Sequence, residues 1–152
     1  MEETAGLEQP TFKLVTIEDY DRIKSLWHRA GLQSRLKGRD SFVMMQQQME
    51  ANPDLFIGAF SDDRMIGFVI GSFDGRLKGW INRLSVDPEY RRLGIAQELI
   101  ARVEEALEKR GITLFCALIE SSNIESLNLF RKIGYVPHDD ILYVSRRKSQ
   151  DI

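Results

Sequence analysis

The sequence contains few of the residues that cross-link a fold or hold a metal ion. Among its 152 residues are one cysteine, Cys116, and two histidines. A lone cysteine excludes an intramolecular disulfide, and no pair of cysteine or histidine ligands has the spacing of a zinc site. We therefore expect no metal site in this chain.

Long apolar runs and an excess of positive charge are also missing. No apolar run approaches the roughly 20 residues that a membrane-spanning helix needs. The 21 basic and 23 acidic residues leave no net positive field for nucleic acid. The N-terminal sequence MEETAGLEQP lacks the charged-then-apolar order of a signal peptide. We expect a cytoplasmic protein that binds neither a membrane nor nucleic acid.

The composition fits one globular domain. The chain is 43% hydrophobic and 29% charged, which is ordinary for globular proteins. Its length falls within the usual range of a single domain. We expect residues 1–10 to be a disordered acidic tail and residues 11–152 to form the single domain.

Hydrophobic periodicity predicts an α+β fold with the element order β-α-α-β-β-β-α-β-α-β-β. Strands are expected over residues 12–17, 55–60, 65–73, 80–86 and 113–119, then around Val136 and over residues 141–145. Helices are expected from the Thr16–Asp19 cap to about residue 30, over residues 40–50, after the arginine pair, and from Asn123. The short connections SDDR and Asp74-Gly75 predict that the three central strands are antiparallel neighbours.

A strand-to-helix junction in the segment LSVDPEYRRLGIA, residues 84–96, has the features of an anion site. Backbone N–H groups in a first helical turn have no partner within the helix, and the helix dipole is positive there. Gly94 and Ala96 leave room for a phosphate, and Arg91 and Arg92 add positive charge. These features fit a pyrophosphate site, but they also fit a basic turn that caps a surface helix. The P-loop and dinucleotide fingerprints are absent from the sequence.

The same junction resembles the acyl-CoA signature of the GNAT acyltransferase superfamily, whose core is Q/R-x-x-G-x-G/A. Arg91, Gly94 and Ala96 occupy its three defined positions. A second segment, SSNIESLNLFRKIGYVP, resembles the family's other hallmark, N-x-x-A-x-x-L-Y-x-x-x-G-F, through residues that include Asn123 and Gly134. The resemblance covers residues 12–147 and is closest to small bacterial members of the YpeA type.

The second segment also carries local helix signals of its own. Ser122 with Glu125 three residues later fits a capping box, which would start a helix there. Gly134 fits the C-terminal cap of the same helix. Both signals agree with a helix between residues 123 and 134.

The resemblance implies a GNAT fold, in which a mixed, largely antiparallel sheet is flanked by helices and its fourth and fifth strands splay apart. The splay would admit the pantetheine arm of acetyl-CoA as the co-substrate, alongside the fourth strand. The residues that the family pattern assigns to the cofactor are Leu84, Ser85, Val86, Arg91, Arg92, Leu93, Gly94, Ile95, Ala96, Asn123 and Phe130. The implied reaction is direct acyl transfer from the thioester to an amine, with a backbone donor of the fourth strand stabilising the oxyanion.

The chain departs from the family pattern at the catalytic acid. Phe130 stands where many members place the tyrosine that protonates the leaving thiolate. Either a water or another hydroxyl replaces it, or the thiolate leaves unaided, because a thiol has a pKa of about 8.5. Leu118 stands where some protein N-terminal acetylases of the family carry a glutamate, which disfavours a ribosomal-protein acetylase.

The remaining catalytic and acceptor candidates each have a plain structural alternative. Glu120 is a candidate base acting through water, or a solvated charge at a strand end. Tyr143 could face the cleft from a late strand, or pack. Asp74 could orient an amine, although a turn before glycine explains it better. Trp27 could line the acceptor pocket, or pack in the core, and Cys116 is expected to be inert core rather than a nucleophile.

Three functions remain open from the sequence. The first is an N-acyltransferase that moves an acetyl group from acetyl-CoA to a primary amine of a small molecule or a protein. The alternative is a GNAT-fold module that binds acyl-CoA with little or no catalysis, and the third is an interaction domain with a fortuitous basic turn. The chain is expected to be a monomer or a homodimer.

Overall fold

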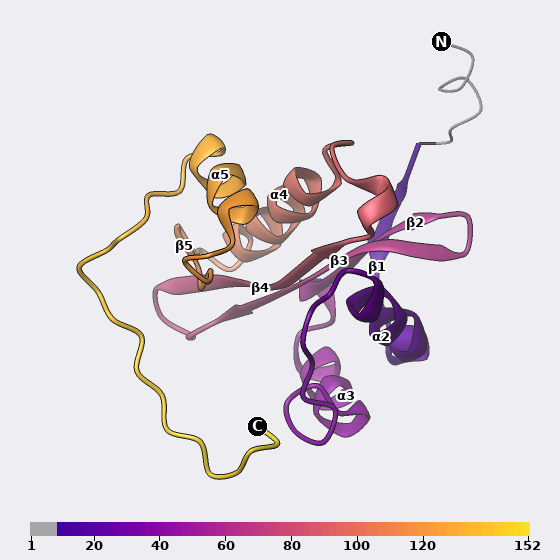
Figure 1. Cartoon of the computed structure of the whole chain (residues 1–152), viewed down its shortest axis with the longest axis horizontal. Coiled ribbons are helices and arrows are strands. Elements are labelled where there is room, and N and C mark those ends of the chain that lie inside the picture. The colour runs from indigo at the N-terminus through magenta and orange to yellow at the C-terminus, as the bar shows by residue number, and fades with distance from the viewer. Residues whose placement is uncertain (1–8) are drawn as a thin grey trace.

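The structure is a computed structural model that describes residues 9–152, with one sheet and helices on both of its faces (Figure 1). The strands are β1 (Thr11–Leu14), β2 (Phe56–Ser61), β3 (Arg64–Phe73), β4 (Lys78–Val86) and β5 (Leu114–Ala117). The helices are α2 (Tyr20–Arg29), α3 (Phe42–Ala51), α4 (Ile95–Glu108) and α5 (Ile124–Lys132), with short 3-10 turns η1 (Ile17–Asp19), η2 (Pro53–Leu55) and η3 (Pro88–Tyr90). The expected tail lies mostly outside the described residues.

The five strands lie in the order β1-β2-β3-β4-β5. Pairing is antiparallel from β1 to β4, and β4 pairs with β5 in parallel. The predicted mixed, largely antiparallel sheet is therefore confirmed, as are the antiparallel central strands. Each of these elements differs from its predicted range only at the ends.

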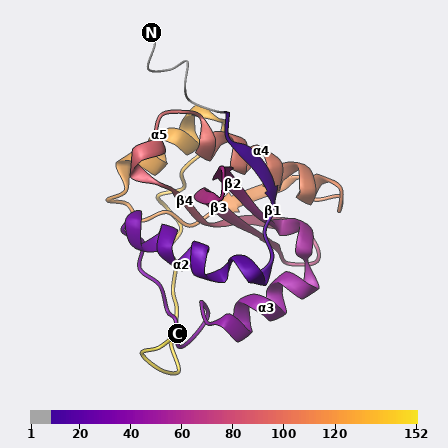
Figure 2. The same ribbon diagram turned by 90° about the vertical axis from the view of Figure 1, so that its right-hand side faces the viewer.

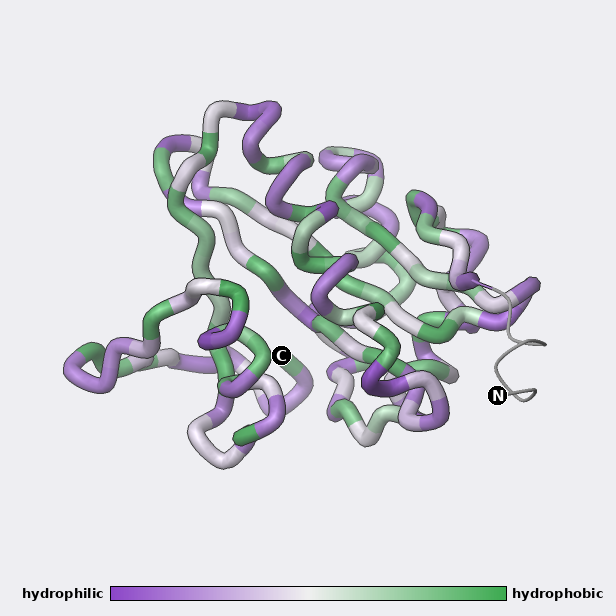
Figure 3. The backbone as a smooth tube through the Cα atoms, turned by 90° about the horizontal axis from the view of Figure 1, so that it is seen from above, coloured by the Kyte–Doolittle hydropathy of each residue, from purple (hydrophilic) through white to green (hydrophobic). Residues whose placement is uncertain are grey.

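Helices α4 and α5 cover one face of the sheet, and α2 and α3 cover the other (Figures 1 and 2). Helix α4 packs on β2, β3 and β4, while α2 packs mainly on β3. Apolar and polar residues alternate in short stretches along the chain (Figure 3), and the central strands β2 and β3 are buried over most of their length. This pattern is what a sheet buried on both faces requires.

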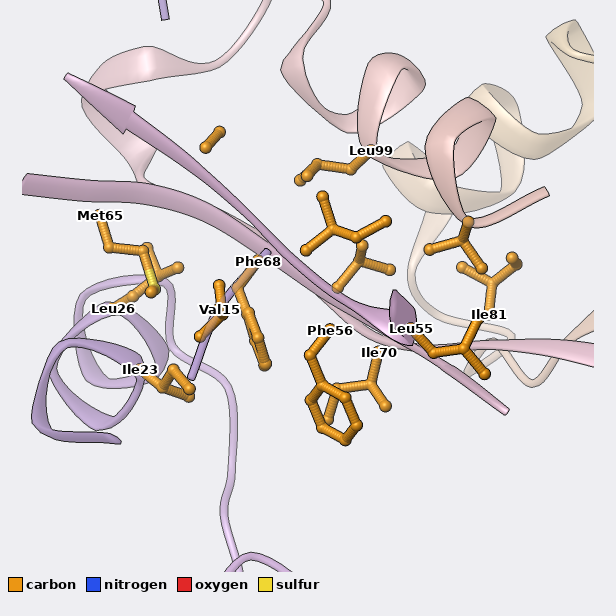
Figure 4. Packing of buried hydrophobic residues seen from close by; sticks show 14 of the residues in the cluster. Val15, Ile23, Leu26, Leu55, Phe56, Met65, Phe68, Ile70, Ile81 and Leu99 are labelled. Atoms are coloured by element: carbon orange, nitrogen blue, oxygen red, sulfur yellow. The ribbon is translucent and has the colours of Figure 1, made fainter. Parts of the chain in front are cut away.

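The core forms on both sides of β3, because alternate side chains of a strand point to opposite faces. On one side, Ile23 and Leu26 of α2 lie beside Phe68 (Figure 4). On the other side, Leu99 of α4 lies over the sheet. All four of these side chains are fully buried. None of the helices within residues 9–152 is both long and apolar enough to cross a membrane.

The structure differs from the prediction after α5, where residues 136–148 form neither helix nor strand. The two strands expected around Val136 and over residues 141–145 are therefore absent. A strand needs a neighbouring edge to pair with, and this part of the chain runs clear of the sheet (Figure 1). Periodicity in the sequence reports strand propensity, but it does not supply the partner.

Candidate functional site

The sheet opens between β4 and β5. Their pairing ends at Ile81 and Ala117, whereas β4 continues to Val86 alongside β3. Within that extension Arg83 has a φ of 55°, a left-handed conformation that is uncommon for a residue other than glycine. The register of β3 and β4 also shifts next to this point, as at a bulge. Beyond Ile81, therefore, β4 still pairs with β3 along one edge, but β5 no longer pairs with its other edge.

A cleft of about 510 Å³ occupies this opening, bounded by the end of β4, the start of α4 and α5. Its lining residues are Ala30, Leu32, Leu84, Ser85, Val86, Tyr90, Arg91, Arg92, Gly94, Ile95, Ala96, Gln97, Asn123, Glu125, Ser126, Leu129 and Lys132. Nine of the residues that the sequence assigned to the cofactor are among them. The two exceptions are Leu93, which is exposed, and Phe130, which is buried.

The turn into α4 is built around Gly94. This residue is the N-cap of α4 with a φ of 78°, and a Cβ added to it would have no heavy atom within 4 Å. The first bond of the helix runs from the Glu98 N–H to the Gly94 carbonyl, so the three N–H groups before Glu98 have no partner inside the helix. The space that a side chain would take at Gly94 is therefore open beside free amide donors. A phosphate group fits such a cradle in size and charge.

Arg91 and Arg92 bring positive charge to the same turn. Arg91 lies 3.9 Å from the Glu125 carboxylate at the start of α5, measured from Nη1 to Oε2. The side chains are 43% and 73% exposed, so water screens this pair and its attraction is weak. A bound phosphate could replace Glu125 as the partner of Arg91 at little cost.

The buried carboxylate of Asp87 holds the chain between β4 and this turn. It accepts hydrogen bonds from Arg29 Nε at 2.8 Å, Arg64 Nη2 at 3.1 Å and the Glu89 N–H at 3.0 Å. Burial alone would raise the pKa of Asp87, but these three hydrogen bonds outweigh burial and hold the pKa below its ordinary value. The carboxylate therefore stays charged and fixes the end of β4 to α2 and β3.

This positioning role of Asp87 was not predicted from the sequence. The available signal was an aspartate before proline at the end of a strand, which is a common cap. Asp87 does cap η3, because its side chain accepts from Glu89. Its two arginine partners come from distant parts of the chain, so sequence alone could not identify them.

Asn123 lies at the start of α5 and lines the same cleft as Gly94. Its Oδ1 accepts a hydrogen bond from the Ser126 N–H at 3.1 Å, so it is the N-cap of the helix. The capping box expected from Ser122 and Glu125 is thus replaced by Asn123 itself. The carboxamide oxygen serves the cap, which leaves the two NH₂ donors outside that bond, and Asn123 is one of the residues that line the cleft.

Phe130 is not among the residues that line the cleft, and its assignment as a cofactor residue stays a prediction. It is 5% exposed, and its ring meets that of Tyr135 edge-on with 4.9 Å between the centroids. The Tyr135 hydroxyl donates to Glu104 of α4 at 2.5 Å, and burial raises the pKa of Tyr135. Phe130 and Tyr135 therefore join α5 to α4, and their neighbourhood is apolar core.

The two acceptor candidates, Trp27 and Asp74, make contacts typical of structural residues. Trp27 is 1% exposed in the core, with the Arg83 guanidinium 4.4 Å above its ring. Asp74 accepts three backbone hydrogen bonds, at 2.8, 2.8 and 3.0 Å, from the turn between β3 and β4. Those bonds lower its pKa. These contacts favour the turn interpretation of Asp74 and the packing interpretation of Trp27.

The two catalytic candidates, Glu120 and Tyr143, are not among the residues that line the cleft. Glu120 is exposed after β5. Tyr143 is 69% exposed, because the late strand that would have carried it is absent. Cys116 in β5 is partly buried, and burial raises the pKa of its thiol, which disfavours a nucleophilic thiolate.

Known acetyltransferases resemble this chain over most of its length. The model of the acetyltransferase (GNAT) family matches residues 19–135. The chain is 28% identical over 134 residues to "Acetyltransferase SG1711" of Sodalis glossinidius, covering 88% of this chain and 92% of that protein. It is 30% identical over 131 residues to "Acetyltransferase plu1384" of Photorhabdus laumondii, covering 86% and 90%.

Two solved structures share the fold. The PaiA N-acetyltransferase of Thermoplasma acidophilum, in complex with coenzyme A, superposes with a TM-score of 0.75 at 22% identity, covering 87% of this chain and 92% of that one. AAC(6')-Iy, in complex with the bisubstrate analogue CoA-S-monomethyl-acetylneamine, has a TM-score of 0.75 at 16% identity, covering 92% and 99%. At these identities the likeness concerns the fold alone.

Proposed function

This chain belongs to the acetyltransferase (GNAT) family, and we propose that it transfers an acetyl group from acetyl-CoA directly to a primary amine. The observation that carries the proposal is the meeting of two features in one cleft. The free edge of β4 offers backbone donors and acceptors, and the glycine turn of α4 offers amide donors beside two arginines. Together they match the pantetheine arm and the pyrophosphate of an acyl-CoA molecule.

The pyrophosphate would bind at the turn between Arg91 and Ala96. The open space at Gly94 admits the phosphate oxygens, and the unpaired amides of the first helical turn would donate to them. The guanidinium groups of Arg91 and Arg92 would add charge-assisted hydrogen bonds, which are the stronger kind. This part of the site binds and does no chemistry.

The pantetheine arm would lie along the end of β4. Ser85 and its neighbours Leu84 and Val86 line the cleft, and their backbone groups would pair with the amides of the arm as an added strand does. A backbone N–H of this segment would also donate to the thioester carbonyl oxygen, which gains negative charge when the amine attacks. When bound, acetyl-CoA supplies the activated acetyl group.

The departing sulfur needs little help from the protein. Phe130 offers no proton and lies in the core, so we assign it no catalytic role. A thiol with a pKa of about 8.5 is a good leaving group near neutral pH. Three hydroxyl groups line the cleft, those of Ser85, Tyr90 and Ser126, and water can reach it because it is open to solvent.

A second function, acyl-CoA binding with little or no catalysis, is favoured by one observation. No carboxylate or imidazole other than Glu125 is among the cleft residues, and Glu125 already faces Arg91. A base of this kind would normally take the proton of the attacking amine. If the amine binds already neutral, or loses its proton to water, the transferase proposal needs no such residue.

We extend the proposal to the cellular setting of the chain. We place it in the cytoplasm, as one domain over residues 11–152. The single cysteine supports a reducing compartment only weakly. One sheet and one apolar cluster that run from β1 to α5 support the single domain. Small-molecule amines and protein amines are both candidate acceptors.

A screen of amine acceptors tests the proposal. Purified protein is mixed with acetyl-CoA and with polyamines, amino acids, aminoglycosides or peptides, and release of free CoA is followed together with the mass of the acceptor. We expect at least one amine to gain an acetyl group in step with CoA release, and Gly94→Glu to abolish both. Silence across the panel, with acetyl-CoA still bound, would instead establish the binding-module function.

A further inference from the structure

Arg83 occupies a position of β4 at which glycine would be the easier residue. Two residues of β4, Arg83 and Leu84, lie opposite a single residue of β3, Val69, so the strand bulges there. Arg83 is the first residue of the bulge and has a φ of 55°. Glycine is favoured at such a position, because a side chain makes the left-handed conformation costly. An arginine at this point therefore needs side-chain contacts that offset the cost.

The Arg83 side chain makes contacts of this kind. Its Nη2 donates to the Gln33 carbonyl at 2.8 Å and to Asp40 Oδ2 at 3.2 Å, while the guanidinium lies over the ring of Trp27. The side chains of Arg83 and Asp40 are 17% and 4% exposed. Water and salt screen a buried ion pair much less than a surface pair, and a charge-assisted hydrogen bond is stronger than a neutral one. The guanidinium is thus held firmly.

Asp40 is itself fixed by other parts of the chain. Its Oδ2 accepts a hydrogen bond from the Arg35 N–H at 2.7 Å. Its backbone carbonyl accepts one from the hydroxyl of Tyr20, at the start of α2, also at 2.7 Å. Residues 30–41 connect α2 to α3, and the beginning of this connection lines the cleft. The ion pair therefore ties the bulge of β4 to a segment that is anchored to α2 and borders the same cleft.

The bulge decides which way the last residues of β4 face. Successive residues of a strand direct their backbone groups to alternate edges and their side chains to alternate faces. Removing the extra residue of the bulge would therefore turn Leu84, Ser85 and Val86 around, as a one-residue slip in register does. These three residues line the cleft. Binding along this edge thus depends on keeping the bulge.

We propose that Arg83 is a positioning residue of the acyl-CoA site, whose ion pair with Asp40 keeps β4 in the bulged conformation that binds the cofactor. The ion pair acts by offsetting the cost of the left-handed φ at residue 83. Glycine adopts this φ without that cost, so a glycine at this position should make the ion pair unnecessary. The inference rests on the proposed function, because it takes the cleft to be the acyl-CoA site.

Calorimetric titration of CoA into a set of variants tests this inference. Arg83→Met removes the ion pair but keeps a side chain at the strained position, so CoA affinity should fall roughly 10-fold, about 1.4 kcal/mol. Asp40→Asn removes the partner charge and should lower the affinity by a similar factor. Arg83→Gly should bind CoA within about threefold of wild type, and adding Asp40→Asn to it should have no further effect on affinity.

The melting temperature separates positioning from stability. Arg83→Met and Arg83→Gly both lose the guanidinium contacts with Gln33 and Trp27, so both should melt below wild type, but only Arg83→Met should lose affinity. Asp62→Met is the matched control, because Asp62 has a φ of 53° in the turn between β2 and β3 and is not among the cleft residues. It should bind CoA like wild type.

Two results would overturn the inference and leave the proposed function standing. One is an equal loss of affinity in Arg83→Gly and Arg83→Met, because the side chain would then act by something other than holding the bulge. The other is undiminished affinity in both Arg83→Met and Asp40→Asn. If Arg83→Met does not fold, Asp40→Asn with and without Arg83→Gly decides the question. A wild-type chain that binds no CoA overturns the proposed function and this inference together.

Discussion

Replacing Asp87 with asparagine tests how the cleft is held in place. The carboxylate is 1% exposed and lies between the Arg29 and Arg64 guanidinium groups at the end of β4. An asparagine side chain would keep the size and one acceptor oxygen, but it would lose the charge that both arginines face. The substitution therefore isolates the ion pairs from the packing.

The expected loss in the free energy of unfolding lies between the loss caused by breaking a surface ion pair and that caused by breaking a buried one. Removing one partner of a fully buried pair costs about 3–5 kcal/mol. The Arg29 and Arg64 side chains are 26% and 49% exposed, so water can solvate them after the carboxylate is lost, and the cost falls to about 2 kcal/mol. For a chain of this size that lowers Tm by about 4–8 °C.

The loss should depend on pH in a defined direction. The folded pKa of Asp87 is lowered, so the carboxylate adds stability above its unfolded pKa of about 3.9 and loses it as the pH falls through the folded value. The difference in Tm between wild type and Asp87→Asn should be full at neutral pH and shrink in acid below about pH 4.

Differential scanning calorimetry across pH measures this directly. Asp54→Asn is the matched control, because Asp54 binds Arg110 with two contacts of 2.7 Å but its side chain is 43% exposed. The Asp54→Asn substitution should lower the free energy of unfolding by about 1 kcal/mol or less. An equal loss in both variants, or a loss in Asp87→Asn that persists unchanged in acid, would refute the argument from buried charge.

Three further substitutions address the site. Phe130→Tyr should leave CoA affinity and turnover unchanged but lower Tm, because a hydroxyl buried beside Tyr135 costs about 1–3 kcal/mol of stability if it finds no partner. A large rise in turnover would instead place the new hydroxyl at the thioester. Cys116→Ala should keep full turnover, and lost turnover with an intact melting profile would require a covalent thiol mechanism. Glu125→Gln should bind CoA more tightly by less than about 1 kcal/mol, because it removes an exposed negative charge from the phosphate site. Calorimetry at low salt measures this difference, and weaker binding would mean that Glu125 contacts the ligand favourably.

The sequence predicted those parts of the site whose geometry is local. The turn at Gly94 follows from a strand that ends, a residue free to adopt a positive φ, and a helix that begins. All three signals lie within a few residues. The order of strands and helices up to α5 was predictable for the same reason, since each element carries its own periodicity.

Features that depend on distant contacts were not predictable. Phe130 occupies the family's tyrosine position in the sequence, but its ring meets that of Tyr135, a contact that depends on how the chain turns after α5 and packs against α4. Asp87 looked like an ordinary cap, because nothing in the sequence joins it to Arg29 or Arg64. Residues 141–145 have the propensity of a strand, but the chain does not bring them to an edge of its own sheet.

The most direct test of the central claim is calorimetric titration of CoA into Gly94→Glu and Gly111→Glu. Both glycines have a positive φ, 78° and 81°, and open space where a Cβ would point, so both variants carry the same backbone strain. They flank opposite ends of α4, and only Gly94 lines the cleft. We expect Gly94→Glu to lose roughly 10²-fold or more in affinity, about 2.7 kcal/mol, and Gly111→Glu to bind like wild type. Undiminished affinity in Gly94→Glu would contradict the claim that the cleft beside β4 binds the pyrophosphate of acyl-CoA.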